Sequence, residues 1–195
     1  DLVGKFVNIA SRCAGFITKQ FAGRLAPDDD APELLERVRA EADAIAAAYE
    51  GRDFARAMRE VMALADAVNQ YVDRRKPWVL AKDPGAQAEL QRVCSTGLRA
   101  FRLLMIYLKP VLPTLVAAAE TFLRSEPLRW NALTKPWGDA GIDAYTPLLT
   151  RIDPLKVQAM IDSTKAAAAA TQTGSAASAP AAPATSDPAH ISIDD

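Results

Sequence analysis

The sequence contains very few of the residues on which most enzyme chemistry depends. Its 195 residues include one histidine, His190, and two cysteines, Cys13 and Cys94, each alone in an apolar helical pattern. A Ser-His-Asp triad, a two-histidine motif and a histidine-rich metal site are therefore impossible within this chain. The cysteine spacing predicts neither a zinc site nor a disulfide framework, and no GxGxxG or GxxxxGK phosphate loop occurs. We expect a binding domain that is not an enzyme by itself.

Long apolar runs and an excess of charge of either sign are also absent. No stretch approaches the ~18 uninterrupted apolar residues of a membrane span, and the chain opens without a secretory signal, so we expect a cytoplasmic protein that does not bind membranes. The net charge is −1, so any affinity for nucleic acid must come from the distribution of charge. Aromatic residues make up only 7% of the chain, whereas alanine is abundant. Alanine is the strongest helix former, and the composition predicts an all-α fold.

Apolar residues recur at three- and four-residue steps over most of the chain, which predicts an antiparallel helix bundle. Helices are expected over residues 2–22, 32–49 and 54–76, between Gly85 and Pro110, over 113–123, and over 154–165. Asp53 can cap the third of these helices. Residues 125–150 are rich in Pro, Gly and Trp and are expected to be irregular. These patterns predict one helical domain over residues 1–165.

The composition changes after the last predicted helix. Residues 166–190 are mostly Ala, Ser, Thr and Pro, which cannot bury enough apolar surface to offset the entropy of ordering. We expect a linker there, with a helical extension over 166–170 and disorder from Thr171 to Ala189. Residues 191–195, ISIDD, alternate like the first strand of a further module.

An acidic run, Asp28-Asp29-Asp30, precedes the second predicted helix. Three successive carboxylates in a loop point in different directions, so a metal site is not expected. We interpret the run as a solvated loop that leads into the helix.

Two features of the sequence suggest binding. The first is Asn8 and Arg12, which are four residues apart, so that their side chains emerge on one helix face. An amide and a guanidinium at that spacing present one acceptor and several donors to a flat, hydrogen-bonding partner. A solvated helix face without a binding function is the alternative interpretation of the spacing alone.

The second feature is Asp73-Arg74-Arg75-Lys76-Pro77-Trp78, which places a basic cluster and an indole at a helix end broken by proline. The cations suit a phosphate backbone, and an exposed indole offers a stacking surface to an unpaired base. In the alternative interpretation the indole plugs the bundle and the cations only favour the helix C-terminus. With Lys19 of the first helix, the three cations are candidate contacts to an RNA backbone.

Four stretches of the sequence, in order, resemble the anticodon-binding domain of the methionyl-tRNA synthetase family. Residues 7–16, VNIASRCAGF, resemble its first helix, and 54–82, FARAMREVMALADAVNQYVDRRKPWVLAK, resemble its third helix and the following loop. Residues 101–113, FRLLMIYLKPVLP, match the next helix, and 148–154, LLTRIDP, resemble the closing segment. The resemblance covers roughly residues 2–165.

This resemblance implies a function and a site. In the family, an Asn and an Arg on the first helix hydrogen-bond the first anticodon base and a Trp stacks on it; Asn8, Arg12 and Trp78 stand at the matching positions. The implied partner is methionine tRNA, initiator and elongator, with its CAU anticodon, and not DNA. ATP, magnesium and, as an option, zinc would belong to a catalytic domain outside this chain. Residues 191–195 resemble the start of a C-terminal OB-fold module through which such a parent protein could form a homodimer.

Two rival interpretations stay open from the sequence. One is the anticodon domain of another class I synthetase, such as the isoleucyl, valyl or leucyl enzyme. The Asn8, Arg12 and Trp78 set and the KPWVLAK stretch argue against it. The other is a helical protein-interaction module whose basic cluster is only a solvated surface.

Overall fold

A computed structural model of the chain describes residues 3–135, 137, 141–149 and 154–174. The chain divides into two compact units, Asp1–Thr150 and Arg151–Asp195. All regular elements of the described residues are helical, apart from one isolated bridge between Arg24 and Gly141. The predicted all-α fold class is confirmed.

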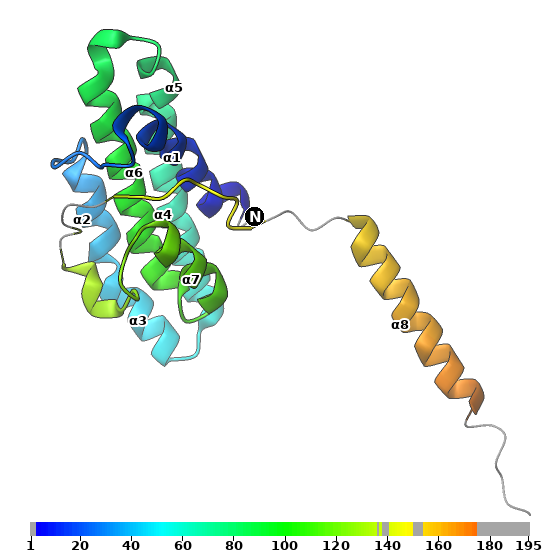
Figure 1. The fold of residues 1–195 in the computed structure, drawn as a ribbon. Helices are drawn as coiled ribbons and strands as arrows, with labels where there is room; N and C mark the ends of the chain where they lie inside the picture. Colours follow the sequence, from blue (N-terminus) through cyan, green and yellow to red (C-terminus); the bar gives the residue numbers. More distant parts are fainter. Residues whose placement is uncertain (1–2, 136, 138–140, 150–153, 175–195) are drawn as a thin grey trace, which may run out of the picture. The chain divides into compact units, whose positions relative to one another are not determined.

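The elements follow one another with short connections, as Figure 1 shows for the first unit. In chain order they are η1 (Val3–Val7, a π-helix), α1 (Asn8–Phe21), α2 (Pro32–Ala40), α3 (Ala42–Glu50), α4 (Phe54–Arg75), α5 (Pro77–Leu80), η2 (Pro84–Ala86, a 3-10 helix), α6 (Gln87–Leu108), α7 (Pro113–Phe122), η3 (Trp130–Leu133, a 3-10 helix) and α8 (Pro154–Gly174).

Helix α6 forms the centre of the first unit. It packs against α1, α2, α4, α5 and α7 (Figure 1), and every residue from Cys94 to Leu108 except Arg99 is buried. A helix that is apolar around most of its circumference must be covered on all sides. This explains why the shorter helices surround it.

Helix α1 approaches α6 closely at Gly97. A Cβ atom added there would lie 2.8 Å from the Sγ of Cys13, so the absence of a side chain permits the contact. Cys13 and Cys94 are both buried and free. A hydrogen bond to Cys13, together with burial, raises the pKa of the Cys94 thiol, and such thiols are unreactive.

The expectation of a solvated loop is wrong for Asp29 and Asp30, whereas the side chain of Asp28 is 62% exposed. Asp29 pairs with Arg99 of α6 at 2.7 Å. Asp30, whose side chain is only 12% exposed, accepts from Arg75 of α4 at 2.7 Å and from the Tyr71 hydroxyl at 2.9 Å. These two carboxylates lie inward because Arg99 and Arg75, whose side chains are 13% and 36% exposed, are partly removed from water and are stabilised by an acidic partner.

Two buried hydroxyls fix the backbone of the same loop. Ser95 Oγ accepts from the amide of Ala26 at 2.8 Å, and Thr96 Oγ1 accepts from the amide of Asp30 at 2.9 Å. Burial and the neighbouring Asp30 carboxylate raise the pKa of Tyr71, which therefore stays protonated as a donor. The segment between α1 and α2 is thus fastened to both long helices.

The predicted helix boundaries are close to those observed, with three differences, two of which concern the helices before Asp53. The first α-helix begins at Asn8 after the π-turn η1, and the helix expected over 32–49 is divided at Glu41. The backbone of Glu41 has ψ 0°, yet its carbonyl still accepts from the amide of Ile45 at 3.0 Å. The predicted cap is confirmed: Asp53 Oδ1 accepts from the amide of Arg56 at 3.0 Å.

The last helix is longer than the sequence pattern suggested. α8 runs from Pro154 to Gly174, so the expected disorder does not begin at Thr171, because the alanine-rich stretch of 166–170 has high helix propensity and continues the helix. The compact first unit ends at Thr150, and this helix belongs to the second. The rest of the expected linker, His190 and the expected module start at 191–195 lie outside the described residues. No described helix is long and apolar enough to cross a membrane.

We predict that Gly97→Ala destabilises the first unit. Overpacking costs about 1–3 kcal/mol, against a gain in helix propensity of about 1 kcal/mol, and urea unfolding followed by circular dichroism measures the balance. The matched control is Gly15→Ala on α1, where nothing lies within 4 Å of the added Cβ, and which should not lower stability. In a double-mutant cycle Cys13→Ala should relieve the loss; additive free energies would contradict the contact.

Candidate nucleic-acid interface

One face of α1 and the indole of Trp78 line a surface cavity of about 340 Å³ that is open to solvent. The lining residues of α1 recur at three- and four-residue steps, on the face opposite the buried stripe; they are Ser11, Arg12, Gly15, Phe16 and Lys19. The buried stripe consists of Ile9, Ala10, Cys13, Ala14 and Ile17. Because the apolar residues of α1 face the core, the opposite face of the same helix is left to line the cavity.

Trp78 reaches this cavity because the chain turns sharply after α4. Lys76 has a left-handed backbone (φ 47°), and the buried Pro77 begins the short helix α5. Trp78 is 38% exposed, so it does not plug the bundle as the alternative interpretation proposed. Its ring borders the cavity from a different element than α1.

Arg12 joins α1, α4 and α5 at this point. Its guanidinium carbon lies 4.7 Å from the Trp78 ring centroid, and its Nη2 lies 2.5 Å from Asp73 Oδ1 at the end of α4. A guanidinium has five donors in a planar fork, so the bond to Asp73 fixes its orientation while other N–H groups remain for a ligand. The stack and the ion pair together preorganise one cation beside one aromatic ring.

A second contact, made by η1 just before α1, sets the register of this N-terminal segment against α4. Lys5 Nζ pairs with Asp66 at 2.7 Å, seven residues before the Arg12–Asp73 pair on both segments, so the two run in the same direction. Between the pairs, Asn69 Nδ2 donates to the Lys5 carbonyl at 3.0 Å. Both ion pairs are partly exposed, and each should contribute less than about 1 kcal/mol.

The structure brings some of the predicted site residues together and leaves others apart. Arg12, Lys19 and Trp78 line the same cavity. Asn8 is half-buried, one turn before Arg12 at the start of α1, and does not line the cavity. Lys76 is exposed at the turn between α4 and α5.

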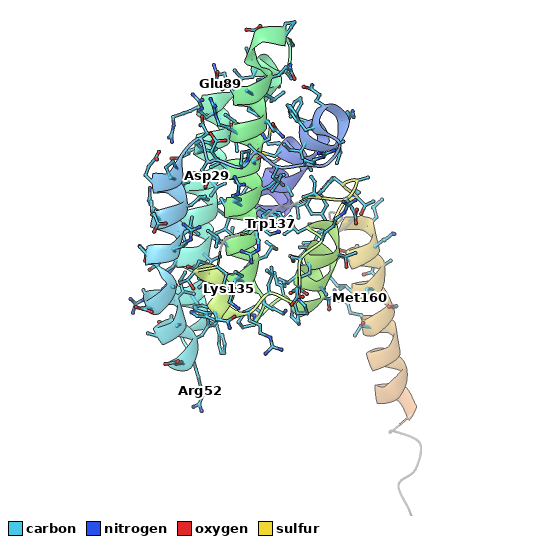
Figure 2. The ribbon with its side chains drawn as sticks, turned by 60° about the vertical axis from the view of Figure 1, so that its left-hand side comes forward. Asp29, Arg52, Glu89, Lys135, Trp137 and Met160 are labelled. Atoms are coloured by element: carbon cyan, nitrogen blue, oxygen red, sulfur yellow. The ribbon has the colours of Figure 1, made fainter. Side chains whose placement is uncertain are left out.

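The other two predicted cations face elsewhere. Arg75 is bound by Asp30 and by Glu89, each at 2.7 Å, so its charge is used within the fold. Figure 2 labels Glu89, which belongs to α6, and Asp29, which lies on the same side of that helix. Arg74 is exposed but borders a different cavity, with Tyr71 and Glu33.

The sequence assigned no binding role to Ser11, Gly15 and Phe16, which line the cavity, or to Asp73, which holds Arg12. Phe16 is one helical turn after Arg12, so the spacing could have predicted that both side chains lie on the same face of the helix. Asp73 stands directly before the basic cluster, but only the packing of α1 against α4 shows that it pairs with Arg12. Among the described residues, no group of three or more His, Cys, Asp or Glu could hold a metal ion.

The fold of this chain is found in solved structures of a tRNA synthetase. The apo form of Mycobacterium tuberculosis methionyl-tRNA synthetase matches with a TM-score of 0.70 and 21% identity, over 79% of this chain and 33% of that one. The same enzyme bound by methionyl-adenylate matches with a TM-score of 0.71 and 19% identity, over 77% and 32%. The chain thus spans about a third of the length of these structures. It has the fold of a helical domain of a tRNA synthetase.

The sequence identifies the family. The family model of the anticodon binding domain of methionyl tRNA ligase matches residues 22–138, more than half of the chain. This chain therefore belongs to that family of anticodon-binding domains, which confirms the resemblance drawn from the motifs. Trp78 and the basic cluster lie inside the matched range, whereas Asn8, Arg12 and Lys19 precede it.

We predict that Asp73→Ala loosens the stack of Arg12 on Trp78 without unfolding the domain. Asp73 is 62% exposed, so the free energy of unfolding should change by less than about 1 kcal/mol. The side-chain N–H resonance of Trp78 in a proton–nitrogen NMR spectrum should shift. Asp66→Ala, which breaks the neighbouring ion pair, is the matched control and should leave that resonance in place; equal shifts in both variants would contradict the assigned role of Asp73.

Proposed function

We propose that this domain binds the anticodon of methionine tRNAs, initiator and elongator, and reads its CAU sequence. The observation that carries the proposal is the Arg12 guanidinium, stacked on Trp78 and held by Asp73 beside an open cavity of about 340 Å³. The family to which the chain belongs supports it. Unpaired anticodon bases can be splayed out, stacked on aromatic rings and read on their Watson–Crick edges.

The first anticodon base is the one that Asn8 and Arg12 would read. Cytosine presents an exocyclic amine donor beside a ring nitrogen and a carbonyl, both acceptors. The Asn8 amide oxygen would accept from the amine, while Arg12 would donate to the acceptors. Uracil reverses part of this pattern and would leave buried groups unpaired, which costs roughly 1–3 kcal/mol for each group.

Trp78 would supply affinity rather than base choice, because every base has a face that can stack. Its ring already has Arg12 on it at 4.7 Å, and 38% of the residue is exposed. A base that enters the cavity would therefore meet an indole and a cation together. Phe16, half-buried on the next turn of α1, gives the cavity a second aromatic wall.

Backbone phosphates near the anticodon would be met by exposed cations around this cavity. Lys19 is an exposed cation on the cavity wall beside Arg12, and Lys76 is exposed two residues before Trp78. Arg74 is also exposed at the end of α4, but it borders a different cavity. Arg75 is left out of the proposed interface because two carboxylates bind it. With a net charge of −1 for the chain, this local cluster would have to supply the electrostatic attraction.

We further propose that the chain is the tRNA-binding part of a longer cytoplasmic ligase that joins methionine to tRNA. ATP, magnesium and an optional zinc ion would then be bound by residues outside this chain, and the chain alone would be inactive. A homodimer would form through a further module of the same longer protein.

Trp78→Ala should weaken binding of an anticodon stem-loop while the domain stays folded. Loss of a stacked base costs roughly 1–3 kcal/mol, which is about a fivefold to 150-fold rise in the dissociation constant. Filter binding measures the constant, and circular dichroism checks the fold. Val79→Ala is the matched control, since Val79 is its exposed neighbour on α5; an unchanged constant for Trp78→Ala would remove the indole from the interface.

Asn8→Ala and Arg12→Ala should each reduce the preference for cytosine over uracil at the first anticodon position by about tenfold, because each removes one hydrogen-bonding group. Titrations use two stem-loops that differ only in that base. Arg12→Lys keeps the charge but not the planar fork, so it should retain affinity better than selectivity. If both bases lose affinity equally, these residues contact only the backbone.

The rival assignments are tested by exchanging the RNA. Stem-loops of methionine and isoleucine tRNA, titrated at two salt concentrations, should differ in affinity at both. Salt should weaken both complexes, since phosphate contacts release counterions. Equal affinities would contradict methionine specificity, and an absence of RNA binding would favour a protein-interaction module.

A further inference from the structure

A second cavity, separate from the α1 face, lies beside the C-terminal half of α6. It has a volume of about 540 Å³ and is lined by α6, by the segment of residues 124–132 and by Lys135 and Trp137. Figure 2 shows Lys135 and Trp137 farther along α6 from Glu89. No residue of this cavity belongs to the proposed anticodon site, so a ligand bound here would not depend on the proposed function.

Arg102 of α6 is the buried cation of this cavity. The residue is only 8% exposed, and among the described residues no carboxylate pairs with it. Its Nη1 donates to the Ala132 carbonyl at a long 3.4 Å, and its Nε is buried without a partner. The Trp137 ring centroid lies 5.8 Å from the guanidinium carbon. A buried charge without a counter-charge is strongly unfavourable.

Most of the charged groups around Arg102 are cations. Arg39, which packs nearby, gives its Nη1 to Glu36, and burial and the Arg39 charge both lower the pKa of Arg102. An arginine nevertheless stays protonated in proteins. Arg129 and Lys135 are exposed at the rim and have no ion pair among the described residues.

Other polar groups of the cavity complete a donor-rich lining. Ser125 Oγ is buried there without a hydrogen-bond partner. Arg124 is already paired with Asp143 at 2.5 Å, and Glu126 is the one carboxylate among the described lining residues and is exposed. Water could satisfy the free donors, but only an anion could also neutralise the buried guanidinium.

We infer that this cavity is a phosphate-binding site, in which Arg102 holds the phosphate group from below and Arg129 and Lys135 close over it from the rim. Phosphate fits because it is compact, carries up to two charges and offers several strong acceptors to the guanidinium fork. The phosphate group could come from an RNA backbone or from a free phosphate compound, and the two sources share this chemistry.

Thermal unfolding of the whole chain in inorganic phosphate or pyrophosphate, at constant ionic strength, tests the inference. At a concentration ten times the dissociation constant the melting temperature should rise by about 3–6 °C. Arg102→Gln should abolish the rise, whereas Arg59→Gln, an exposed arginine of α4, should keep it. An equal rise in the Arg102→Gln variant, or no rise in the unaltered chain, would overturn the inference.

A variant with substitutions at the rim of the cavity tests phosphate binding without changing a buried residue. If Arg102→Gln fails to fold, the double variant Arg129→Gln and Lys135→Gln changes only exposed side chains. It should weaken phosphate binding at least threefold by titration calorimetry, with an unchanged melting temperature in the absence of phosphate. Unchanged phosphate affinity in that variant would also overturn the inference.

RNA titrations separate the two sources of phosphate. If the site binds a tRNA backbone, Arg102→Gln should lower the affinity for full-length tRNA threefold to tenfold, independently of the anticodon sequence, and should reduce the salt slope by about 1. Pyrophosphate should then compete with tRNA. If the ligand is a free phosphate compound, tRNA affinity should not change while the phosphate-dependent rise in melting temperature is lost. These results also distinguish this site from the α1 cavity, where the anticodon base sets the affinity.

Discussion

The burial of α6 is the constraint on which the rest of the structure depends. From Cys94 to Leu108 all residues but Arg99 are covered, so α1, α2, α4, α5 and α7 must each contribute an apolar face to the same helix (Figure 1). Gly97 lets α1 approach until it meets Cys13. Because α1 and α4 both pack on α6, their solvent-facing sides lie next to each other. Arg12 and Asp73, far apart in sequence, then lie within ion-pair distance.

The charged residues fall into two groups that sequence composition cannot separate. Asp29 and Asp30 hold Arg99 and Arg75, so these charges fasten the loop between α1 and α2 to the long helices. Other cations lie at cavities open to solvent. A chain of net charge −1 can therefore present locally basic surfaces, because the well-covered carboxylates of Asp29, Asp30 and Glu120 are paired with cations within the fold.

The two open cavities repeat one motif, a guanidinium beside an indole. In the α1 cavity Arg12 also has the Asp73 carboxylate, which fixes its direction and reduces its net charge. In the α6 cavity Arg102 has no acidic partner among the described residues. A paired arginine is suited to read a neutral base by hydrogen bonds, whereas an unpaired and buried one favours a full negative charge. The same residue types can therefore serve different ligands.

The sequence by itself determined the helical class, most helix boundaries, the Asp53 cap and the family, because periodicity, capping and ordered motifs are local properties of the chain. It also indicated Arg12 and Trp78 as site residues. Only the tertiary structure decided that the acidic run binds Arg99 and Arg75, that Asp73 orients Arg12, and that Arg102 faces a cavity without a counter-charge. Each of these depends on which side chains from distant segments meet, and ion pairs between distant segments have no signature in local spacing.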